Sequence, residues 1–175
     1  MRPNTTDGYP GRSYRFYTGG DEVFKFGAGM SFTSFEARVA LQDAWHGGLP
    51  SVSLADVQRG LDADADAVVA RVRVAVINVG ARAGAHTALV FVAPPAGVAG
   101  VDGAPLKLLA GFEKKHVDVG GEATIELAVR ARDLALADPV TGAFAPRAGV
   151  WRVWVNNDGE RDALTLTVSS DAALA

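Results

Sequence analysis

Residues 68–77, VVARVRVAVI, alternate apolar and polar side chains with a period of two. The even positions are all apolar, whereas Arg71 and Arg73 fall on the opposite face. This period is typical of a strand that has one face in a core and the other in water, and an amphipathic helix would not produce it. The segment therefore predicts a half-buried strand that needs partners elsewhere in the chain.

Further segments repeat this alternation, with turn-forming residues between them. They are residues 35–41, 87–91, 106–119 (less cleanly), 122–129, 151–155 and 164–168. Gly, Asn, Asp and Pro between neighbouring segments favour tight turns and hence antiparallel pairing. About seven short strands with this spacing predict an all-β fold, an immunoglobulin-like β-sandwich.

Two stretches have no clean period of two. Residues 1–34 are predicted to form an extended N-terminal arm, and residues 42–66 a long loop inserted into a sandwich that spans residues 35–175. Within the loop, Ser53 has the chemistry of a helix N-cap, and Leu54 and Val57 would share a face of a short helical turn. No long helix is expected.

The composition limits the classes of partner. The 175 residues suit one domain, and 49% hydrophobic against 21% charged residues is typical of a globular chain. A net charge of -3 gives no general attraction to nucleic acid or to an anionic membrane, so we expect neither as a partner. The absence of Cys excludes disulfides, thiolate zinc sites and a cysteine nucleophile. No apolar run is long enough for a signal peptide or a membrane span, and the compartment stays unassigned.

Asp62, Asp64 and Asp66 follow one another at a spacing of two, as at the start of a calcium-binding loop. An EF-hand loop would continue with Gly and end with Glu, but Ala67 and Arg73 occupy those positions. A solvated loop is the favoured interpretation, and we expect no metal and no cofactor.

The three histidines, His46, His86 and His116, are far apart in the sequence and form no pair at metal-ligand spacing. No G-x-S-x-G segment indicates a nucleophilic serine. We therefore predict no catalytic residue in this chain, and an independent hydrolase is the least favoured function.

Four ordered motifs resemble one known family. They are GRSYRFYTGGDEVFKFGAGMSFTSF, VAVINVGARAGAHTALVFVAPP, PLKLLAGFEKKHVDVGGEATIELAV, and RDLALAD followed by AGVWRVWV. Together they resemble the C-terminal fibronectin type III-like domain of family 3 glycoside hydrolases, the β-glucosidases and β-xylosidases of carbohydrate metabolism, and the connector that precedes it. The chain departs from the family pattern at Lys25, residues 30–32, His86 and Gly121.

The resemblance implies a fibronectin type III-like sandwich with a structural role. In that family a nucleophilic Asp lies on a first, barrel domain and an acid/base carboxylate usually on a second, so neither can be carried over to this chain. The implied function is that of a non-catalytic accessory domain, from a fragment or truncated form, whose partners are the catalytic domains upstream. Family members are often secreted or vacuolar.

Aromatic residues supply the candidate contact surface. In the arm, Tyr14 and Phe16 alternate with Arg15 and Tyr17, which predicts an extended segment with one docking face. Trp45 lies on the predicted long loop and is the tryptophan best placed for a contact surface. The alternative function is a stand-alone carbohydrate- or protein-binding module that uses Tyr14, Phe16, Tyr17 and Trp45.

The other two tryptophans differ in parity, so they should point to opposite faces of one strand. Trp151 shares its face with Val153 and Val155, which predicts core packing. For Trp154 two positions stay open: exposure on the surface, or burial beneath a loop.

Overall fold

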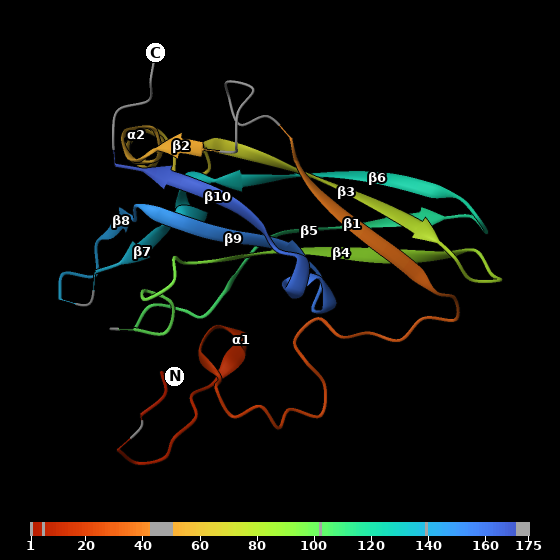
Figure 1. Ribbon diagram of the computed structural model, residues 1–175, viewed down its shortest axis with the longest axis horizontal. Helices are drawn as coiled ribbons and strands as arrows, with labels where there is room; N and C mark the ends of the chain where they lie inside the picture. The colour runs from red at the N-terminus through yellow and green to blue at the C-terminus, as the bar shows by residue number, and fades with distance from the viewer. Residues whose placement is uncertain (1, 5, 43–50, 102, 139, 171–175) are drawn as a thin grey trace.

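A computed structural model describes residues 2–4, 6–42, 51–101, 103–138 and 140–170. Two sheets pack face to face as a β-sandwich (Figure 1). The three-stranded sheet has the order β1 (Phe35–Gln42), β3 (Val68–Asn78), β6 (Glu122–Arg130). The five-stranded sheet has the order β2 (Ser51–Ser53), β10 (Leu164–Ser169), β9 (Gly149–Val155), β4 (Gly84–Ala93), β5 (Leu108–Val117).

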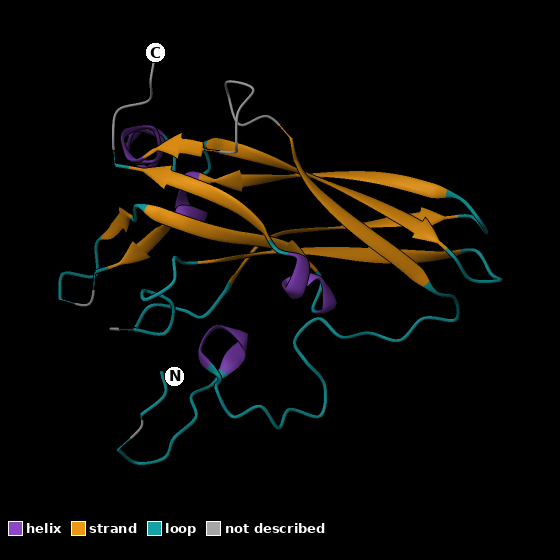
Figure 2. Ribbon diagram, viewed as in Figure 1, coloured by secondary structure: helices purple, strands orange, loops and turns teal. Residues whose placement is uncertain are grey.

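Short elements complete the described chain (Figure 2). A separate two-stranded hairpin contains β7 (Ala135–Ala137) and β8 (Phe144–Pro146). The helical elements are α1 (Ser13–Phe16), α2 (Leu54–Ala63) and two 3-10 turns, η1 (Ala131–Leu134) and η2 (Asp158–Asp162). Among the described residues, no helix is both long and apolar enough to cross a membrane.

Strand β3 confirms the period-two prediction. Val72, Val74 and Val76 have no exposed surface, whereas Arg71 and Arg73 lie in solvent on the other face. The strand pairs antiparallel with both β1 and β6, so it is the central strand of its sheet. Because side chains alternate along a strand, the valines enter the space between the two sheets.

The predicted all-β sandwich is confirmed, since each of the seven predicted segments contains a strand: β1, β3, β4, β5, β6, β9 and β10. The core lies between the sheets, where Ile125 of β6 packs with Trp151 of β9 and Leu166 of β10 among the buried valines. Burial of apolar area at this interface is the main driving force for the fold.

The prediction of a long loop over residues 42–66 was wrong for residues 51–63, which form β2 and α2. Strand β2 adds to the sheet beside β10, in parallel. Helix α2 follows because Leu54, Val57 and Leu61 recur at helical spacing, and Val57 is fully buried in the sandwich core. Residues 43–50, which include Trp45, lie outside the described residues.

Ser53 is the N-cap of α2, as its chemistry predicted. Its Oγ accepts the backbone N–H of Asp56 at 3.0 Å and donates to the Asp56 carboxylate at 2.7 Å. The hydrogen bond that the Ser53 hydroxyl donates to the carboxylate, and next the Arg59 guanidinium, lower the pKa of Asp56 below its ordinary value. The cap satisfies one of the N–H groups that a helix leaves open at its start.

We expect Ser53→Ala to lower the free energy of unfolding by about 1 kcal/mol, because the Asp56 N–H loses its acceptor at a buried position. Urea-induced unfolding measures this change. Ser51→Ala is the matched control, since Ser51 is exposed on the same short strand. Equal losses in both variants would contradict the capping role.

Asn78 joins three parts of the sandwich through a side chain with no exposed surface. Its Nδ2 donates to the carbonyl oxygens of Arg82 at 2.7 Å and Val117 at 3.0 Å. Its Oδ1 accepts from the Gly80 N–H at 3.1 Å and from the Thr33 hydroxyl at 2.9 Å. The β3–β4 turn, the end of β5 and the start of β1 are therefore fixed around one amide.

Candidate functional site

The N-terminal arm runs across the outer face of the five-stranded sheet, where Figure 1 shows it below β4 and β9. It is not extended at the predicted aromatic segment, because Ser13–Phe16 form the single helical turn α1. The turn places Tyr14 against the sheet, where the Leu109 N–H donates to its hydroxyl at 3.3 Å. The prediction of an extended arm was wrong here because this long-range packing overrides local alternation.

Four rings join the arm to the sheet: Tyr14 and Phe26 of the arm, Phe91 of β4 and Trp154 of β9, together called the aromatic latch. Tyr14 stacks on Phe26 with 4.1 Å between ring centroids, and both meet Phe91 edge-on at 6.2 and 6.3 Å. Phe91 stacks on Trp154 at 5.7 Å. Phe91 and Trp154 have no exposed surface, so of the two positions left open for Trp154 the buried one is confirmed.

Backbone contacts hold the arm beside the latch. The Leu106 N–H donates to the Arg15 carbonyl oxygen at 2.7 Å, and Nδ2 of Asn157 donates to the Phe26 carbonyl oxygen at 2.9 Å. Gly27 has a φ of +79°, and a Cβ there would displace the end of the Leu89 side chain of β4. The left-handed φ therefore favours a glycine at this position.

The other two candidate residues of the arm make fewer contacts. Phe16 is half-buried and lines a groove with Leu61 of α2 and Leu136 of β7. Tyr17 is also half-buried, and its hydroxyl donates to the Asp21 carboxylate, a hydrogen bond that raises the pKa of Tyr17 above its ordinary value. Tyr14 is thus the only one of the three in the aromatic latch.

Beyond the latch, the arm presents large apolar side chains to solvent. We call Val23, Phe24, Met30 and Phe32 the arm surface; their exposed fractions are 88%, 74%, 97% and 94%. Single exposed apolar residues are common, but four within ten positions of one segment are typical of an interaction surface. Phe26 in the same segment is 45% exposed, because one side of its ring packs on Tyr14 and Phe91.

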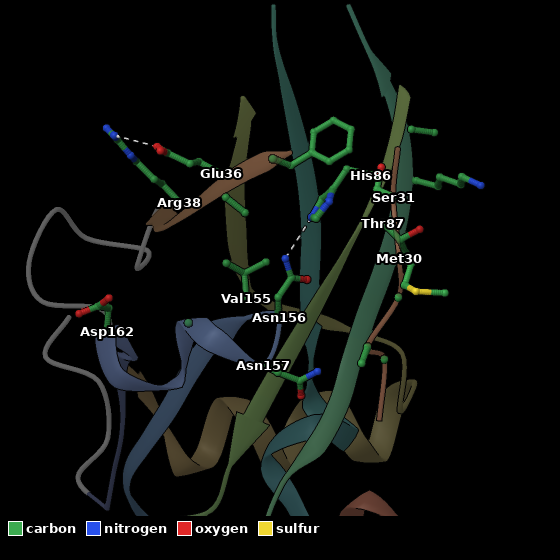
Figure 3. Close-up of a pocket in the computed structure, with 18 residues that line it drawn as sticks. Met30, Ser31, Glu36, Arg38, His86, Thr87, Val155, Asn156, Asn157 and Asp162 are labelled. Carbon is green, nitrogen blue, oxygen red and sulfur yellow. Dashed lines mark hydrogen bonds and ion pairs between the residues drawn. The ribbon is translucent and has the colours of Figure 1, made fainter. Parts of the chain in front are cut away.

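A cleft of about 750 Å³ opens between the arm and the end of the sandwich (Figure 3). Arm residues 27–31 form one wall, and β1, β4 and the turn after β9 form the others. His86 of β4 meets the Phe35 ring of β1 at 5.0 Å between centroids, and the Asn156 amide lies 3.0 Å from His86 Nε2. The cleft therefore lies where the two sheets and the arm converge.

A fibronectin type III-like domain model matches residues 86–159, which run from β4 to η2 and include His86, Trp154 and Asn157. The chain contains a fibronectin type III-like domain. The arm, β1 and β3 lie before the matched range.

The relatives belong to the family that the motifs indicated. β-D-xylosidase 3 of Arabidopsis thaliana is 32% identical over 79% of this chain and 19% of its own length. The exo-1,4-β-xylosidase of Emericella nidulans is 32% identical over 90% of this chain and 19% of its own length. A solved family 3 exo-β-xylosidase, bound to a xylobiose aziridine probe, superposes with a TM-score of 0.74 at 26% identity, covering 96% of this chain and 21% of that one.

These matches confirm the resemblance to family 3 β-xylosidases and β-glucosidases. The chain spans about a fifth of the length of the curated relatives it matches.

Sequence reasoning missed Phe26, Asn156 and Asn157. The run FKFGAGMSF contained a signal, since its glycines indicate close backbone approach, but the residue that they approach is far away in the sequence. Asn156 and Asn157 lie between two predicted strands, where the sequence indicates a turn. Asn156 adopts a left-handed φ of 54°, and its side chain also accepts the Leu89 N–H and lies 3.0 Å from His86 Nε2.

The acidic run 62–66 makes intramolecular contacts. Asp62 accepts from Gln58 Nε2, Asp64 accepts the Asp66 N–H, and Asp66 pairs with Arg130 and Arg132. Within the described ranges, no three His, Asp or Glu residues are grouped so that they could hold a metal ion.

Proposed function

We propose that this fibronectin type III-like domain is a non-catalytic accessory domain of a family 3 glycoside hydrolase, and that it docks on the catalytic domains through the arm surface. The observation that carries the proposal is the exposure of Phe24, Met30 and Phe32 on an arm that is itself fixed to the sheet. The relatives' length supports it, because about four fifths of each is available to supply the opposing surface.

The aromatic latch makes the arm surface suitable for docking. Tyr14 and Phe26 anchor the arm on both sides of residues 17–24, and the start of β1 anchors it after Phe32. Little conformational freedom remains to be lost on binding, and preorganisation of this kind increases affinity. A face with several large apolar side chains also suits a permanent interface between domains.

The alternative of a stand-alone binding module on the arm aromatics has less support. The Tyr14 ring is stacked between Phe26 and the sheet, so it is not available to stack on a sugar. Phe16 and Tyr17 are half-buried at different contacts, and they do not form one platform with Tyr14.

A hybrid enzyme tests the proposal. This chain replaces the matching fifth of the Emericella nidulans exo-1,4-β-xylosidase, to which it is 32% identical. We expect the hybrid to fold and to hydrolyse a nitrophenyl xyloside, and the isolated chain to hydrolyse none. Phe24→Ser with Phe32→Ser should destabilise the hybrid by about 2 kcal/mol, because two rings lose their burial at the interface. Thermal unfolding measures this difference.

Two comparisons control for general effects. The same double variant in the isolated chain should leave the melting temperature unchanged, because both rings are already in solvent. Phe112→Ser removes a ring of similar exposure, 66%, on β5 and should not affect the hybrid. Docking through the arm surface would be excluded if the arm variant leaves the thermal unfolding of the hybrid unchanged. It would also be excluded if Phe112→Ser destabilises the hybrid equally.

A further inference from the structure

Strand β1 forms one edge of the three-stranded sheet. Among the described residues it pairs only with β3, in a register that runs without a shift along the whole strand. It contains neither Pro nor a bulge, two features that commonly protect an edge strand from a further strand. Phe35, Ala37 and Val39 pack on the core but are only half-buried, so this edge of the sandwich is open to solvent.

The backbone groups of β1 that point away from β3 follow from the hydrogen bonds of Asn78. Its N–H donates to the Gly121 carbonyl oxygen at 3.0 Å, and its carbonyl oxygen accepts the Gly120 N–H at 3.1 Å. Phe35 lies opposite Asn78, so it exchanges no backbone hydrogen bond with β3 at this pair. Because hydrogen-bonded and non-hydrogen-bonded pairs alternate, the outward N–H and C=O groups belong to residues 35, 37 and 39.

Two side chains of opposite charge lie on the outer face of this edge. Glu36 and Arg38 have side-chain exposures of 57% and 74%, and they pair with each other at 3.6 Å (Figure 3). Directly opposite them on β3 are Ile77 and Ala75, which carry no charge. An exposed ion pair of this kind contributes little to stability. Both charges can therefore also pair with a strand that adds to the edge.

The order of these charges matches a second copy of the same strand. If two β1 strands run antiparallel about a two-fold axis at Ala37, Ala37 faces itself and Phe35 faces Val39 of the second copy. These residues have the outward backbone groups, so each pair can exchange two hydrogen bonds. Glu36 of each copy then faces Arg38 of the other, in the pair type that brings Cα atoms to about 4.5 Å. Backbone and charges thus select the same alignment.

Other antiparallel registers lose this match. An axis at Arg38 places that side chain opposite its own copy, and an axis at Glu36 does the same with the carboxylates. Like charges directly across a strand pair are unfavourable. An axis between two residues would pair outward with inward backbone groups and form no regular hydrogen bonds. The charge pattern therefore specifies a register as well as a partner.

We propose that the β1 edge is a self-association surface, through which two copies of this chain join their three-stranded sheets into one. Phe35 and Val39 of the two copies meet on the core side and add apolar contact to the backbone hydrogen bonds. The interface is small, so the expected Kd is on the order of 10 μM. Neither Phe24 nor Phe32 lies on β1, although Met30 of the arm surface lines the same cleft as residues 35–38.

Analytical ultracentrifugation of the chain over a concentration series tests the proposal. We expect a reversible equilibrium between monomer and dimer. Glu36→Arg and Arg38→Glu should each raise the Kd at least about tenfold, because like charges then lie directly across the interface. An equimolar mixture of these two variants should form a heterodimer, since each supplies the charge that the other lacks. The double variant Glu36→Arg with Arg38→Glu should form a homodimer again.

Arg71→Glu is the matched control for net charge. Arg71 is exposed on the same face of the sheet as Arg38, but it lies on the central strand β3. This variant should leave the Kd unchanged, and circular dichroism should show that all variants fold. A parent chain that stays monomeric at about ten times the expected Kd would overturn the proposal. So would a mixture of the two edge variants that stays monomeric, or an equal loss of dimer in Arg71→Glu.

The arm surface provides a competing route to a dimer, and one variant separates the two. Phe24→Ser with Phe32→Ser should leave the Kd unchanged, because the β1 edge is intact. A dimer that disappears in this double variant would show that the copies associate through the arm surface, and the β1 proposal would be rejected. Docking in the hybrid enzyme is measured separately, so either proposal can fail without the other.

Discussion

Replacing Asn78 with Asp should lower the free energy of unfolding by about 4 kcal/mol at neutral pH, the largest effect expected from one nearly isosteric change. The Nδ2 group donates to the carbonyl oxygens of Arg82 and Val117. In the variant a carboxylate oxygen takes the place of Nδ2, so it faces these two carbonyl oxygens without a hydrogen to share. The site has no exposed surface, so water cannot compensate. Urea-induced unfolding of the variant and the parent chain measures the loss.

The loss should depend on pH. Burial beside two carbonyl oxygens raises the pKa of the introduced Asp above its unfolded value of about 3.9. Below the unfolded pKa the carboxyl is protonated in both states, and it can donate one of the two lost hydrogen bonds. As pH rises through the folded-state pKa the penalty grows to its full size, so the variant should be relatively most stable in acid.

Thr33→Val provides a graded control, because it removes only the hydroxyl that donates to Asn78 Oδ1. We expect a loss of about 1 kcal/mol with no pH dependence. If the Asp variant loses no more than this one, the Asn78 amide does not hold the β3–β4 turn, β5 and the start of β1 together.

The sandwich could be predicted because each of its strands carries its own evidence. In β3, alternation between valines and arginines reports the two environments of the strand directly, and the same holds for Ile125 and Glu126 of β6. A period of two needs no knowledge of the partner strand. For the same reason Trp151 was correctly assigned to the core from its parity with Val153.

The hydrophobic pattern of residues 54–63 did not predict the full helix α2. Its buried residues are Val57 and Gly60, and the other face carries Arg59 and Asp62, so the apolar stripe is narrow. The Ser53 cap was recognised, but a cap fixes where a helix begins and not how far it continues. The length of α2 follows from its packing against η1, a contact between distant parts of the chain.

The aromatic latch could not be predicted because its rings come from residues 14, 26, 91 and 154. The arm has no periodicity, so its aromatics could equally have served another domain or this one. The structure separates neighbours: Phe26 packs on Tyr14 and Phe91, whereas Phe24 and Phe32 remain in solvent. The position of the arm decides which of its rings contact the sheet.

Removing both arm rings of the latch, Tyr14→Ala with Phe26→Ala, should lower the free energy of unfolding by about 3 kcal/mol and expose Phe91. Phe91 would lose the two rings that meet it edge-on, and Trp154 stacks directly on Phe91. The chain has three tryptophans, so fluorotryptophan NMR is needed to resolve the Trp154 signal. That signal should shift because Phe91, the ring on which Trp154 stacks, loses its two arm contacts, while the signal of Trp151 in the core stays unchanged.

Tyr17→Ala is the matched control, because Tyr17 is a half-buried arm ring that bonds Asp21 within the arm and lies outside the latch. It should cost less than about 0.5 kcal/mol and leave the Trp154 signal in place. A shift of Trp154 in this control, or none in the double variant, would mean that the arm does not rest on the sheet in solution. In the hybrid xylosidase the double variant should also weaken docking, because an arm without its latch no longer holds Phe24 and Phe32 in place.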